Sequence, residues 1–520
     1  MPILQASLPV EPINQRVGPI KKRKHKKKAE RPPAVHIVSL GCPKNLVDTE
    51  LMCGQLGTAG FAFADSAEDA DVLLINTCGF IEPACREARQ EVEMGVEWRK
   101  QRPGRRLVVA GCWVQRYGAQ VRENYPEIDL LLDLNAVPES AERIAALFRL
   151  PAPAADSSSK YRARPPAPDP ADQSKYRARP PAPDSRHAAP AADSLSGKPA
   201  SFLADEHSPR LLLTPPDHGY LKIAEGCAHG CRFCTIPSIR GALRSRPVES
   251  LVAEAQTLLD CGVCEINLIA QDTTQYGRDR NDGATLPALL RALDPLTADE
   301  YWLRLLYTHP AHFSDEIIET LRNGVHIVPY IDIPLQHISD SVLHAMGRRT
   351  PAADIRALLS RLRERIPGVA LRTTFLVGYP GETDADFAEL LDFVRDMRFE
   401  RLGCFPFYPE VGTPAARLHA ENPVPTEVAE ERRDQLMLAQ QTIALENNQA
   451  LVGKTLDVLV EGQSEDGDIL ARSAMDAPDV DDRVLLPPDS TPAVPHFLRV
   501  RVTQAGAYDL AAEPVEEGES

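Results

Sequence analysis

The sequence predicts a multidomain α/β protein, and three observations support this fold class. The chain has 520 residues, which is too many for a single hydrophobic core. Short β-branched apolar runs alternate with helix-like stretches over most of its length, as they do in proteins built on parallel sheets. One long Pro- and Ala-rich segment that is poor in large apolar side chains interrupts this alternation, so separate folded parts are expected on its two sides.

Residues 1–34 are predicted to form a basic, disordered arm. They contain nine Lys or Arg and two Glu, a net charge of +7, whereas the whole chain carries -16 and the remainder therefore -23. The run "KKRKHKKK", Lys21 to Lys28, has no apolar periodicity, which is typical of disorder. Such an arm could bind a phosphate-rich partner such as RNA by releasing counterions, or it could be a solvated tail that aids solubility.

Residues 35–150 are predicted to form a parallel α/β domain. Three apolar runs, "VHIVSLGC", "DVLLINTC" and "RLVVAGC", end in Cys42, Cys78 and Cys112, and helix-like stretches separate them. Because the carboxyl ends of parallel strands meet at one edge of a sheet, these three cysteines are expected to meet there. A single cysteine of this kind is usually a buried structural residue, but the same placement three times favours a shared site. Cys53 and Cys85 lie inside the helix-like stretches and are interpreted as structural.

Residues 151–208 are interpreted as a disordered linker rich in Pro and Ala. The stretch 151–200 contains eleven Pro and thirteen Ala but no Val, Ile, Met, Phe or Trp, so it cannot bury enough surface to offset the entropy lost on ordering. Within it the segment "SKYRARPPAPD" occurs twice. We interpret the repeat as a duplicated, semi-rigid spacer.

Residues 209–450 are predicted to form a partial (β/α)6 barrel with a trailing helix. Strand-like runs begin with "GYLKIAEGC" and continue through "CEINLIAQ", "YWLRLLY", "HIVPYIDIPLQ", "VALRTTFLVGYPGE" and "RLGCFPFYPE". Five helix-like segments separate these six runs, and a long helical stretch follows them. In barrels of this kind the chemistry takes place at the carboxyl ends of the strands.

A second cysteine triad stands just past the first barrel strand, in "EGCAHGCRFCTIP". Cys227, Cys231 and Cys234 are spaced by four and then three positions, and Phe233 precedes the last of them. Cysteine thiolates hold zinc or iron–sulfur clusters, and a 4Fe-4S cluster usually takes one Cys for each of its four irons. Three cysteines leave one iron open for a substrate or cofactor, whereas a zinc knuckle would need a fourth ligand nearby.

Several other residues have both a functional and a structural interpretation. Gly378 and Gly381 in "GYPGET" could let the backbone approach a ligand closely, or could form a simple turn. His309 and His337 could contact a substrate at the barrel strand ends, or could be structural histidines. The remaining cysteines are interpreted as buried thiols although two of them have CxxC spacing: Cys261, Cys264 and Cys404.

Residues 451–515 are predicted to form a small β-barrel. The runs "TLDVLVEG", "DILARSA", "DRVLLPP" and "HFLRVRVTQAGAYDLAAEP" give four or five short strands. The segment from Glu461 to Asp482 is strongly acidic, which is unfavourable for binding phosphates. It therefore predicts an acidic face that attracts a basic protein.

These motifs resemble those of the radical S-adenosylmethionine (SAM) methylthiotransferase family. The triad in the barrel resembles the radical SAM signature, and the last domain matches the family's TRAM domain in position. The segments "SLGCPKNLVDTE", "NTCGFIEPA", "GCWVQRY", "YIDIPLQH" and "GYPGET" resemble the branch that modifies an aspartate of small-subunit ribosomal protein S-twelve. A branch that acts on transfer RNA is the alternative, and a non-catalytic two-cluster electron carrier is a third reading.

The resemblance implies two 4Fe-4S clusters and SAM as cofactors. Cys42, Cys78 and Cys112 would hold the second cluster of the family, and the barrel triad would hold the radical SAM cluster. One SAM would methylate a sulfur atom on the open iron of the former, and another SAM, cleaved at the latter, would yield the radical that takes hydrogen from the aspartate β-carbon. Phe233, Gly378 and Gly381 would lie near SAM; no catalytic residue beyond the cluster ligands is assigned.

The resemblance also implies partners and a location. Ribosomal protein S-twelve, free or within the small subunit, would be the substrate, and a carrier such as flavodoxin or ferredoxin would supply electrons. The sequence has no run of about 18 apolar residues and no apolar signal segment, so a cytoplasmic protein without membrane contact is expected.

Overall fold

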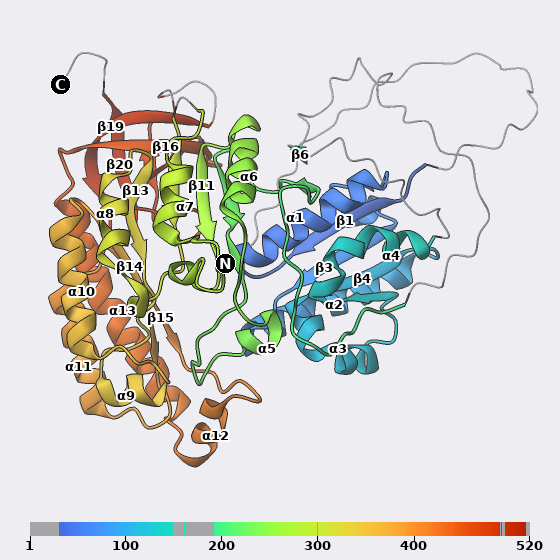
Figure 1. The fold of residues 1–520 in the computed structure, drawn as a ribbon, viewed down its shortest axis with the longest axis horizontal. Coiled ribbons are helices and arrows are strands. Elements are labelled where there is room, and N and C mark those ends of the chain that lie inside the picture. Colours follow the sequence, from blue (N-terminus) through green and yellow to red (C-terminus); the bar gives the residue numbers. More distant parts are fainter. Residues whose placement is uncertain are drawn as a thin grey trace, which may run out of the picture.

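The computed structural model describes residues 31–148, 161–162, 192–298, 300–488, 490 and 495–515. These residues form three folded units, which run from blue to cyan, from green to orange, and red in Figure 1. The predicted α/β multidomain class is confirmed. Residues 1–30 of the predicted arm and most of the predicted linker, residues 151–160 and 163–191, lie outside the described residues.

The N-terminal unit is a five-stranded parallel sheet in the order β2-β1-β3-β4-β5. Helices α1 and α4 pack on one face of the sheet and α2 and α3 on the other, so the central strand β3 is buried at every residue. The two edge strands add to the three strands that the sequence predicts. The strands are β1 (Ala34–Ser39), β2 (Ala62–Phe63), β3 (Val72–Thr77), β4 (Arg106–Gly111) and β5 (Leu130–Leu132), and the helices are α1 (Pro43–Thr58), α2 (Glu82–Gln101), α3 (Cys112–Asn124) and α4 (Ser140–Ala146), with short 3-10 turns at Ala67–Asp69 and Leu134–Glu139.

Residues 192–208, which the sequence assigns to the linker, are partly packed on this unit. Asp193 forms an ion pair with Arg122 of α3 at 2.7 Å, and Ser194 makes an isolated parallel bridge with Leu132. The side chain of Leu195 covers Gly118, where any Cβ would lie 2.4 Å from it. Next, β7 (Arg210–Leu211) pairs with β6 (Tyr161–Arg162) and leads toward the barrel.

The central unit is the predicted partial barrel of six parallel strands, in the order β15-β14-β13-β12-β11-β8. Each strand lies beside the next one in sequence, as repeated right-handed crossovers produce. The strands are β8 (His218–Lys222), β11 (Glu265–Ile269), β12 (Trp302–Leu305), β13 (Ile327–Asp332), β14 (Ala370–Val377) and β15 (Arg401–Pro406), and the intervening helices are α6 (Val248–Asp260), α7 (Leu286–Leu293), α8 (Asp315–Asn323), α10 (Ala352–Arg365) and α11 (Asp384–Met397). Shorter elements complete the unit: β9 (Ala224–Glu225), α5 (Ile236–Arg240), β10 (Arg244–Ser245), α9 (Asp340–Ala345), α12 (Pro414–Glu421) and 3-10 turns at Thr273–Gln275 and Pro310–His312.

The two faces of the barrel strands have different chemistry. In β11, Ile266 and Leu268 point to the hydrophobic core under the helices, whereas Glu265 and Asn267 are buried polar residues between them. Polar side chains such as Arg304 of β12 likewise lie on the inner face and are fully buried. The barrel interior is therefore polar and needs partners for its charges.

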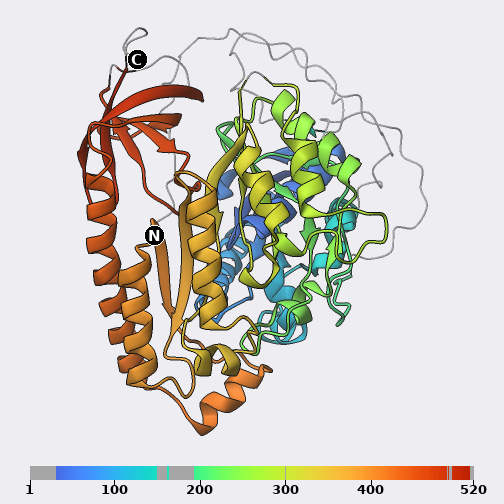
Figure 2. The same ribbon diagram turned by 60° about the vertical axis from the view of Figure 1, so that its left-hand side comes forward.

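Helix α13 (Thr426–Gln449) leads to the third unit, a closed barrel in the order β16-β17-β18-β20-β19. Figure 2 shows this small barrel at one end of α13. Five strands agree with the predicted four or five, and the last predicted run is a hairpin of two strands. They are β16 (Thr455–Gln463), β17 (Ile469–Ser473), β18 (Val484–Leu486), β19 (His496–Ala505) and β20 (Leu510–Pro514).

The loop after β17 supplies partners for the polar interior of the large barrel. Asp476 accepts a hydrogen bond from Arg401 at 2.7 Å, and Asp481 accepts from the hydroxyl of Tyr330 at 2.6 Å and from Arg372 at 3.2 Å. The sequence assigns these two carboxylates to an acidic surface, and that is wrong for them because they bind Arg401, which is buried, and Arg372, which is half-buried. Other members of the same segment, Glu465, Asp466 and Asp479, are exposed.

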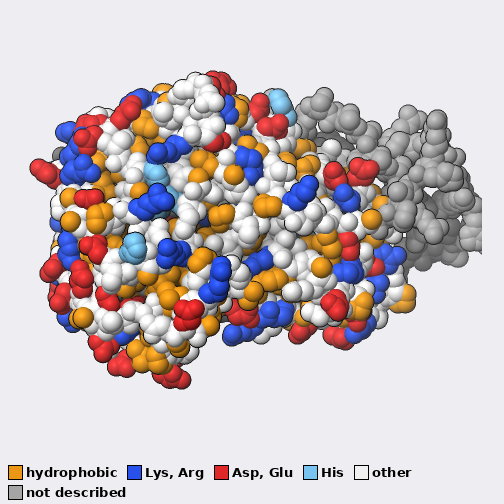
Figure 3. All heavy atoms as spheres, turned by 60° about the horizontal axis from the view of Figure 1, so that its bottom comes forward, with side chains coloured by type: hydrophobic (Ala, Val, Ile, Leu, Met, Phe, Trp, Pro, Cys, Tyr) orange, Lys and Arg blue, Asp and Glu red, His pale blue; other side chains and the backbone are white. Residues whose placement is uncertain are grey.

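The surface that bears α5, α9 and α12 comes forward in Figure 3. Lysine, arginine and histidine side chains lie on this face among hydrophobic ones. In the part of the chain that the structure describes, no helix is long and apolar enough to cross a membrane.

Candidate active site

The first cysteine triad lies at the carboxyl edge of the N-terminal sheet. Cys42 is the N-cap of α1, Cys78 follows β3 directly, and Cys112 is the first residue of α3. Gly41 has φ +91°, and a Cβ on it would lie 2.7 Å from the Cβ of Cys78, so glycine allows the loop after β1 to come this close to β3. The structure thus brings the three predicted residues to one edge, and their role as ligands stays a prediction.

The second triad lies in the loop between β9 and α5, and donors surround its sulfur atoms. The backbone N–H of His229 donates to Sγ of Cys227 at 3.4 Å, and that of Ile236 donates to Sγ of Cys234 at 3.5 Å. The third sulfur atom accepts a hydrogen bond from the side chain of Arg348. Such donors stabilise thiolate ligands and tune a cluster that is bound to them.

Burial disfavours the charged form of the cysteines in both triads. It raises the pKa of Cys78 and of Cys227 to about 11, and that of Cys112 and of Cys234 to about 12. A positively charged metal offsets this effect because it replaces the proton on sulfur. The sites therefore suit thiolates only when they are bound to metal.

A buried network of charged side chains joins the two triads. Arg240, at the end of α5, donates through Nη2 to Sγ of Cys112 at 3.1 Å and through Nη1 to Asp48 of α1 at 2.7 Å and Glu225 at 3.0 Å. Lys222 contacts the same two carboxylates. Burial alone would raise the pKa of Glu225, but Arg240 and Lys222 lower it to about 2, so this carboxylate is ionised. Because Glu225 precedes the loop of the second triad, Arg240 ties one triad to the other.

Two further buried ion pairs fix the N-terminal unit on the barrel. Arg210 pairs with Glu50 of α1 at 2.6 Å, and Arg116 of α3 pairs with Glu410 at 2.8 Å. All four side chains are at most 8% exposed. These ion pairs at the interface between the N-terminal unit and the barrel therefore help to fix the relative position of the two triads.

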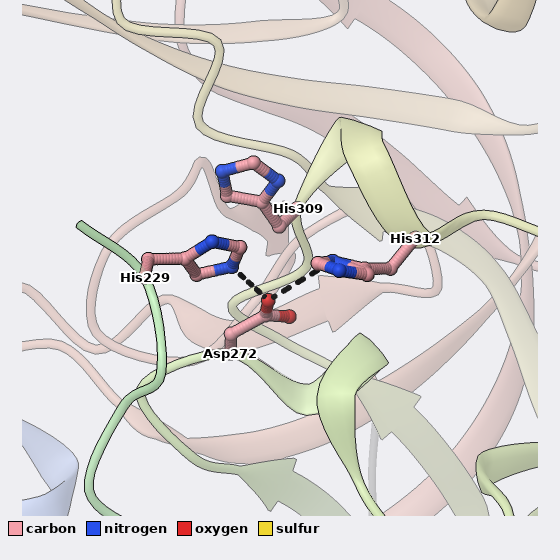
Figure 4. A group of neighbouring side chains, drawn as sticks. All are labelled: His229, Asp272, His309 and His312. Carbon is pink, nitrogen blue, oxygen red and sulfur yellow. Dashed lines mark hydrogen bonds and ion pairs between the residues drawn. The ribbon is translucent and has the colours of Figure 1, made fainter. Parts of the chain in front are cut away.

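Three histidines and an aspartate form a polar group beside the second triad (Figure 4). Asp272, after β11, lies 2.6 Å from Nε2 of His229 and 3.7 Å from Nδ1 of His312. The ring of His309 stacks on that of His229, with 4.0 Å between centroids. Burial lowers the pKa of His309 and of His312 below the usual value for histidine, so both rings are neutral at pH 7. The four side chains therefore place hydrogen-bonding groups next to the loop that carries Cys227.

The other predicted site residues lie around this loop or farther along the barrel. Phe233 is half-buried and packs against a small cluster that contains Met346. Gly378 has φ +73°, and a Cβ on it would lie 2.3 Å from that of Ala429 in α13, so packing against this helix already requires glycine there. Gly381 also has a positive φ, +86°. Contact of these three residues with SAM stays a prediction.

The residues interpreted as structural do not join either triad. His337 is buried, accepts a hydrogen bond from the backbone of Ser339, and has Nε2 3.9 Å from Glu382. The five remaining cysteines lie outside both triads, and their structural role stays a prediction: Cys53, Cys85, Cys261, Cys264 and Cys404.

Three family models match the chain, one on each folded unit. They are "Uncharacterized protein family UPF0004" over residues 34–133, "Radical SAM superfamily" over 221–394 and "TRAM domain" over 452–515. Among curated proteins, the ribosomal protein uS12 methylthiotransferase RimO of Syntrophus aciditrophicus is 42% identical over 488 residues, 93% of this chain and 99% of that protein. The RimO of Opitutus terrae is 42% identical over 92% of this chain and 96% of that protein, and that of Trichlorobacter lovleyi 39% over 93% and 98%.

The chain belongs to the RimO family. Membership implies SAM and a 4Fe-4S cluster as cofactors through the radical SAM domain. The second triad fits such a cluster, because it presents three thiols with donors to each sulfur atom and leaves one iron free to bind SAM.

Sequence reasoning missed several polar residues that the RimO family fold gathers around the triads. His229 and Asp272 had a usable signal, since one stands inside "CAHGC" and the other directly follows a strand end. For Arg240 and Lys44 the sequence alone contains no signal that predicts their role. Arg240 contacts Cys112 and Lys44 contacts Tyr307, and each of these partners lies more than 100 positions away in the chain.

Proposed function

We propose that the protein attaches a methylthio group to the β-carbon of an aspartate in ribosomal protein uS12. The observation that carries this proposal is the arrangement of two cysteine triads at facing edges of two units, joined by the buried Arg240. The β-carbon of aspartate has no acidic hydrogen, so acid–base catalysis cannot activate it. A reaction at that carbon needs a radical and a sulfur donor, one for each triad.

Both clusters are part of the proposal. The barrel triad, Cys227, Cys231 and Cys234, would hold the cluster that binds SAM, and the first triad, Cys42, Cys78 and Cys112, would hold the second cluster. When bound, these groups supply one-electron cleavage of SAM and an iron site for sulfur. The number of thiols in each triad and their buried, donor-rich surroundings support the assignment.

The residues of the chain position and shield this chemistry. Arg240 and Lys222 hold Asp48 and Glu225 as buried ions, which keeps the two triads in register. His309 and His312, whose pKa burial lowers below the usual value for histidine, offer hydrogen bonds beside the second triad without adding positive charge. Phe233, Gly378 and Gly381 are proposed to border SAM.

The partners follow from the same proposal. The substrate is uS12, free or within the small subunit, and a flavodoxin or ferredoxin would deliver the electrons. The basic arm would add contact with ribosomal RNA, and the enzyme would act in the cytoplasm, where ribosomal proteins are found. The proposed domain limits are those of the sequence prediction, except that the end of the linker packs on the N-terminal unit through residues such as Asp193 and Ser194: 1–34, 35–150, 151–208, 209–450 and 451–515.

Anaerobic reconstitution with iron and sulfide tests the function directly. The loaded protein is incubated with SAM, a reductant and either purified uS12 or bulk transfer RNA, and the products are analysed by mass spectrometry. We expect the mass of one methylthio group on a single aspartate of uS12, and none without reductant. Modification of transfer RNA with unchanged uS12 would instead support the other branch of the family.

A further inference from the structure

Lys44, the second residue of α1, is a buried cation without a protein counter-ion. Its residue is 8% exposed, and its Nζ lies 2.9 Å from the centroid of the Tyr307 ring. Within the described ranges it has no carboxylate within 4 Å and donates no hydrogen bond. Nearby Lys222 and Arg240 are each paired with two carboxylates. The Nζ of Lys44 is not among the fully buried polar atoms, so a counter-ion for this largely buried side chain can reach it from outside the chain.

The ring beneath this ammonium is a fixed platform. Tyr307 follows β12 and has φ +59°, a left-handed conformation that is strained for a tyrosine. Its N–H donates to Asp332 at 2.9 Å and its carbonyl accepts from the N–H of Thr273 at 2.9 Å. Its hydroxyl makes no hydrogen bond to any residue that the structure describes. Strain that is held by such contacts is typical of ligand sites.

The position of Lys44 on α1 puts it next to the first triad and to the charged network. It stands two residues after Cys42, and Asp48, one helical turn later, pairs with Arg240 of that network. Asp332 is already engaged by Arg372, at 3.0 Å, and so is not free to neutralise Lys44. In the proposed function, the reacting carbon must lie between the two triads, at this interface of the two units.

We propose that Lys44 binds the side-chain carboxylate of the target aspartate, with Tyr307 as the aromatic support of its ammonium. This inference rests on the proposed function and names the group that recognises the substrate. The carboxyl carbon is bonded to the β-carbon, so holding the carboxylate fixes the reacting carbon one bond away. A buried cation also distinguishes aspartate from asparagine, which has the same shape but no charge.

A binding experiment tests this assignment without relying on turnover. Peptides that carry the target loop of uS12, with Asp or with Asn at the modified position, are titrated into the cluster-loaded protein without reductant, and fluorescence anisotropy gives both dissociation constants. We expect the unsubstituted protein to bind the Asp peptide about tenfold or more tightly than the Asn peptide. In K44M and K44Q the ratio should fall to about one, because the charge that discriminates between the peptides is gone.

Control measurements keep a folding defect apart from a binding defect. Iron content and thermal midpoint are compared for all variants, and K198M, which replaces an exposed lysine, is the matched control and should keep the ratio. Should K44M and K44Q retain the preference for Asp, the carboxylate is bound elsewhere and the proposal is overturned. The proposal also fails if K44M loses iron while its ratio is unchanged, since Lys44 would then serve the first cluster.

If uS12 binds with the expected ratio but is never modified, the proposed function fails and the role of Lys44 stands.

Discussion

At the scale of single residues, the six triad cysteines carry the clearest test. Replacing Cys227, Cys231 and Cys234 by Ala should leave about half the iron of the reconstituted protein, because one of two equal clusters is lost. SAM cleavage should disappear, since the other triad lies in another unit. Iron and sulfide analysis and detection of 5'-deoxyadenosine measure both effects. The double variant C261A/C264A should keep all its iron, and full iron in the triple variant would contradict the assignment.

Arg240 makes a second residue-scale prediction. Replacing it by Met leaves Asp48 and Glu225 buried with Lys222 alone and removes the contact with Sγ of Cys112. Breaking a buried ion network in this way costs about 3–5 kcal/mol. The thermal midpoint of R240M should therefore fall by many degrees.

A matched variant shows whether that loss comes from burial. R291M removes an exposed pair with Glu316, whose side chains are 56% and 57% exposed, and should cost at most about 1 kcal/mol. Calorimetry of both variants in the cluster-loaded state compares them. Equal midpoints for R240M and R291M would show that the network does not hold the two units together.

The residues differ in how far the sequence could reveal them. The six cysteines could be predicted because ligand spacing and strand ends are local features of the chain. Arg240 and Lys44 could not, because each looks like an ordinary surface cation until its partner 128 or 263 positions away is known. Tertiary packing, and not the local sequence pattern, determines which charged residues are buried at the interface between the units.

At the scale of helices and strands, periodicity predicted the long elements and missed the short ones. The strands β1, β3 and β4 and all six barrel strands coincide with apolar runs that the sequence shows. Strands β2 and β5 have two and three residues, too few for any period to be recognised. Helix α1 was predicted, but not the burial of Asp48 and Glu50 on it, because their partners belong to the barrel.

The turn after β14 gives a prediction at this scale. Gly378 has φ +73° and faces α13, where an added Cβ would lie 2.3 Å from that of Ala429. G378A should cost about 1–2 kcal/mol for the backbone conformation and about 1–3 kcal/mol for overpacking. The added methyl group should push α13 away from the barrel.

Gly412 provides the control for backbone strain alone. It has φ +89°, but no atom lies within 4 Å of an added Cβ, so G412A should cost only about 1–2 kcal/mol. Thermal unfolding of the two variants isolates the contact with α13. If G412A were as unstable as G378A, the close approach of α13 would not be what requires glycine.

At the scale of the whole molecule, the sequence predicted the order of the units but not how they pack. One hydrophobic cluster contains Val47 of the N-terminal unit, Tyr220 of the large barrel and Leu459 of the small one, so the three units share a core. The acidic segment 461–482 reads as one surface in sequence, yet Asp476 and Asp481 bind arginines inside the large barrel. Removing residues 451–520 would expose those arginines, so this truncation tests stability as well as binding.

A charge reversal on the exposed part of that segment is a sharper test of how uS12 is recognised. Glu465 and Asp466 lie in the exposed turn between β16 and β17. If they attract the basic uS12, E465K/D466K should weaken its binding about tenfold at low salt, and the loss should shrink at high salt because exposed charges are screened. SAM cleavage should not change, because this turn and the triads lie at opposite ends of the barrel strands. The eight residues of β14 span about 26 Å, which gives the scale of that separation.

The matched control is E427K/E430K, which makes the same change in net charge on exposed residues at the start of α13. This helix of 24 residues is about 36 Å long, so the control lies far from the small barrel. Surface plasmon resonance at two salt concentrations compares both variants with the unsubstituted protein. A local contact depends on the positions of the charges, whereas long-range attraction depends on net charge. Equal weakening of uS12 binding by the two variants would therefore mean that net charge alone attracts uS12. Unchanged binding of E465K/D466K would exclude the small barrel as the docking surface.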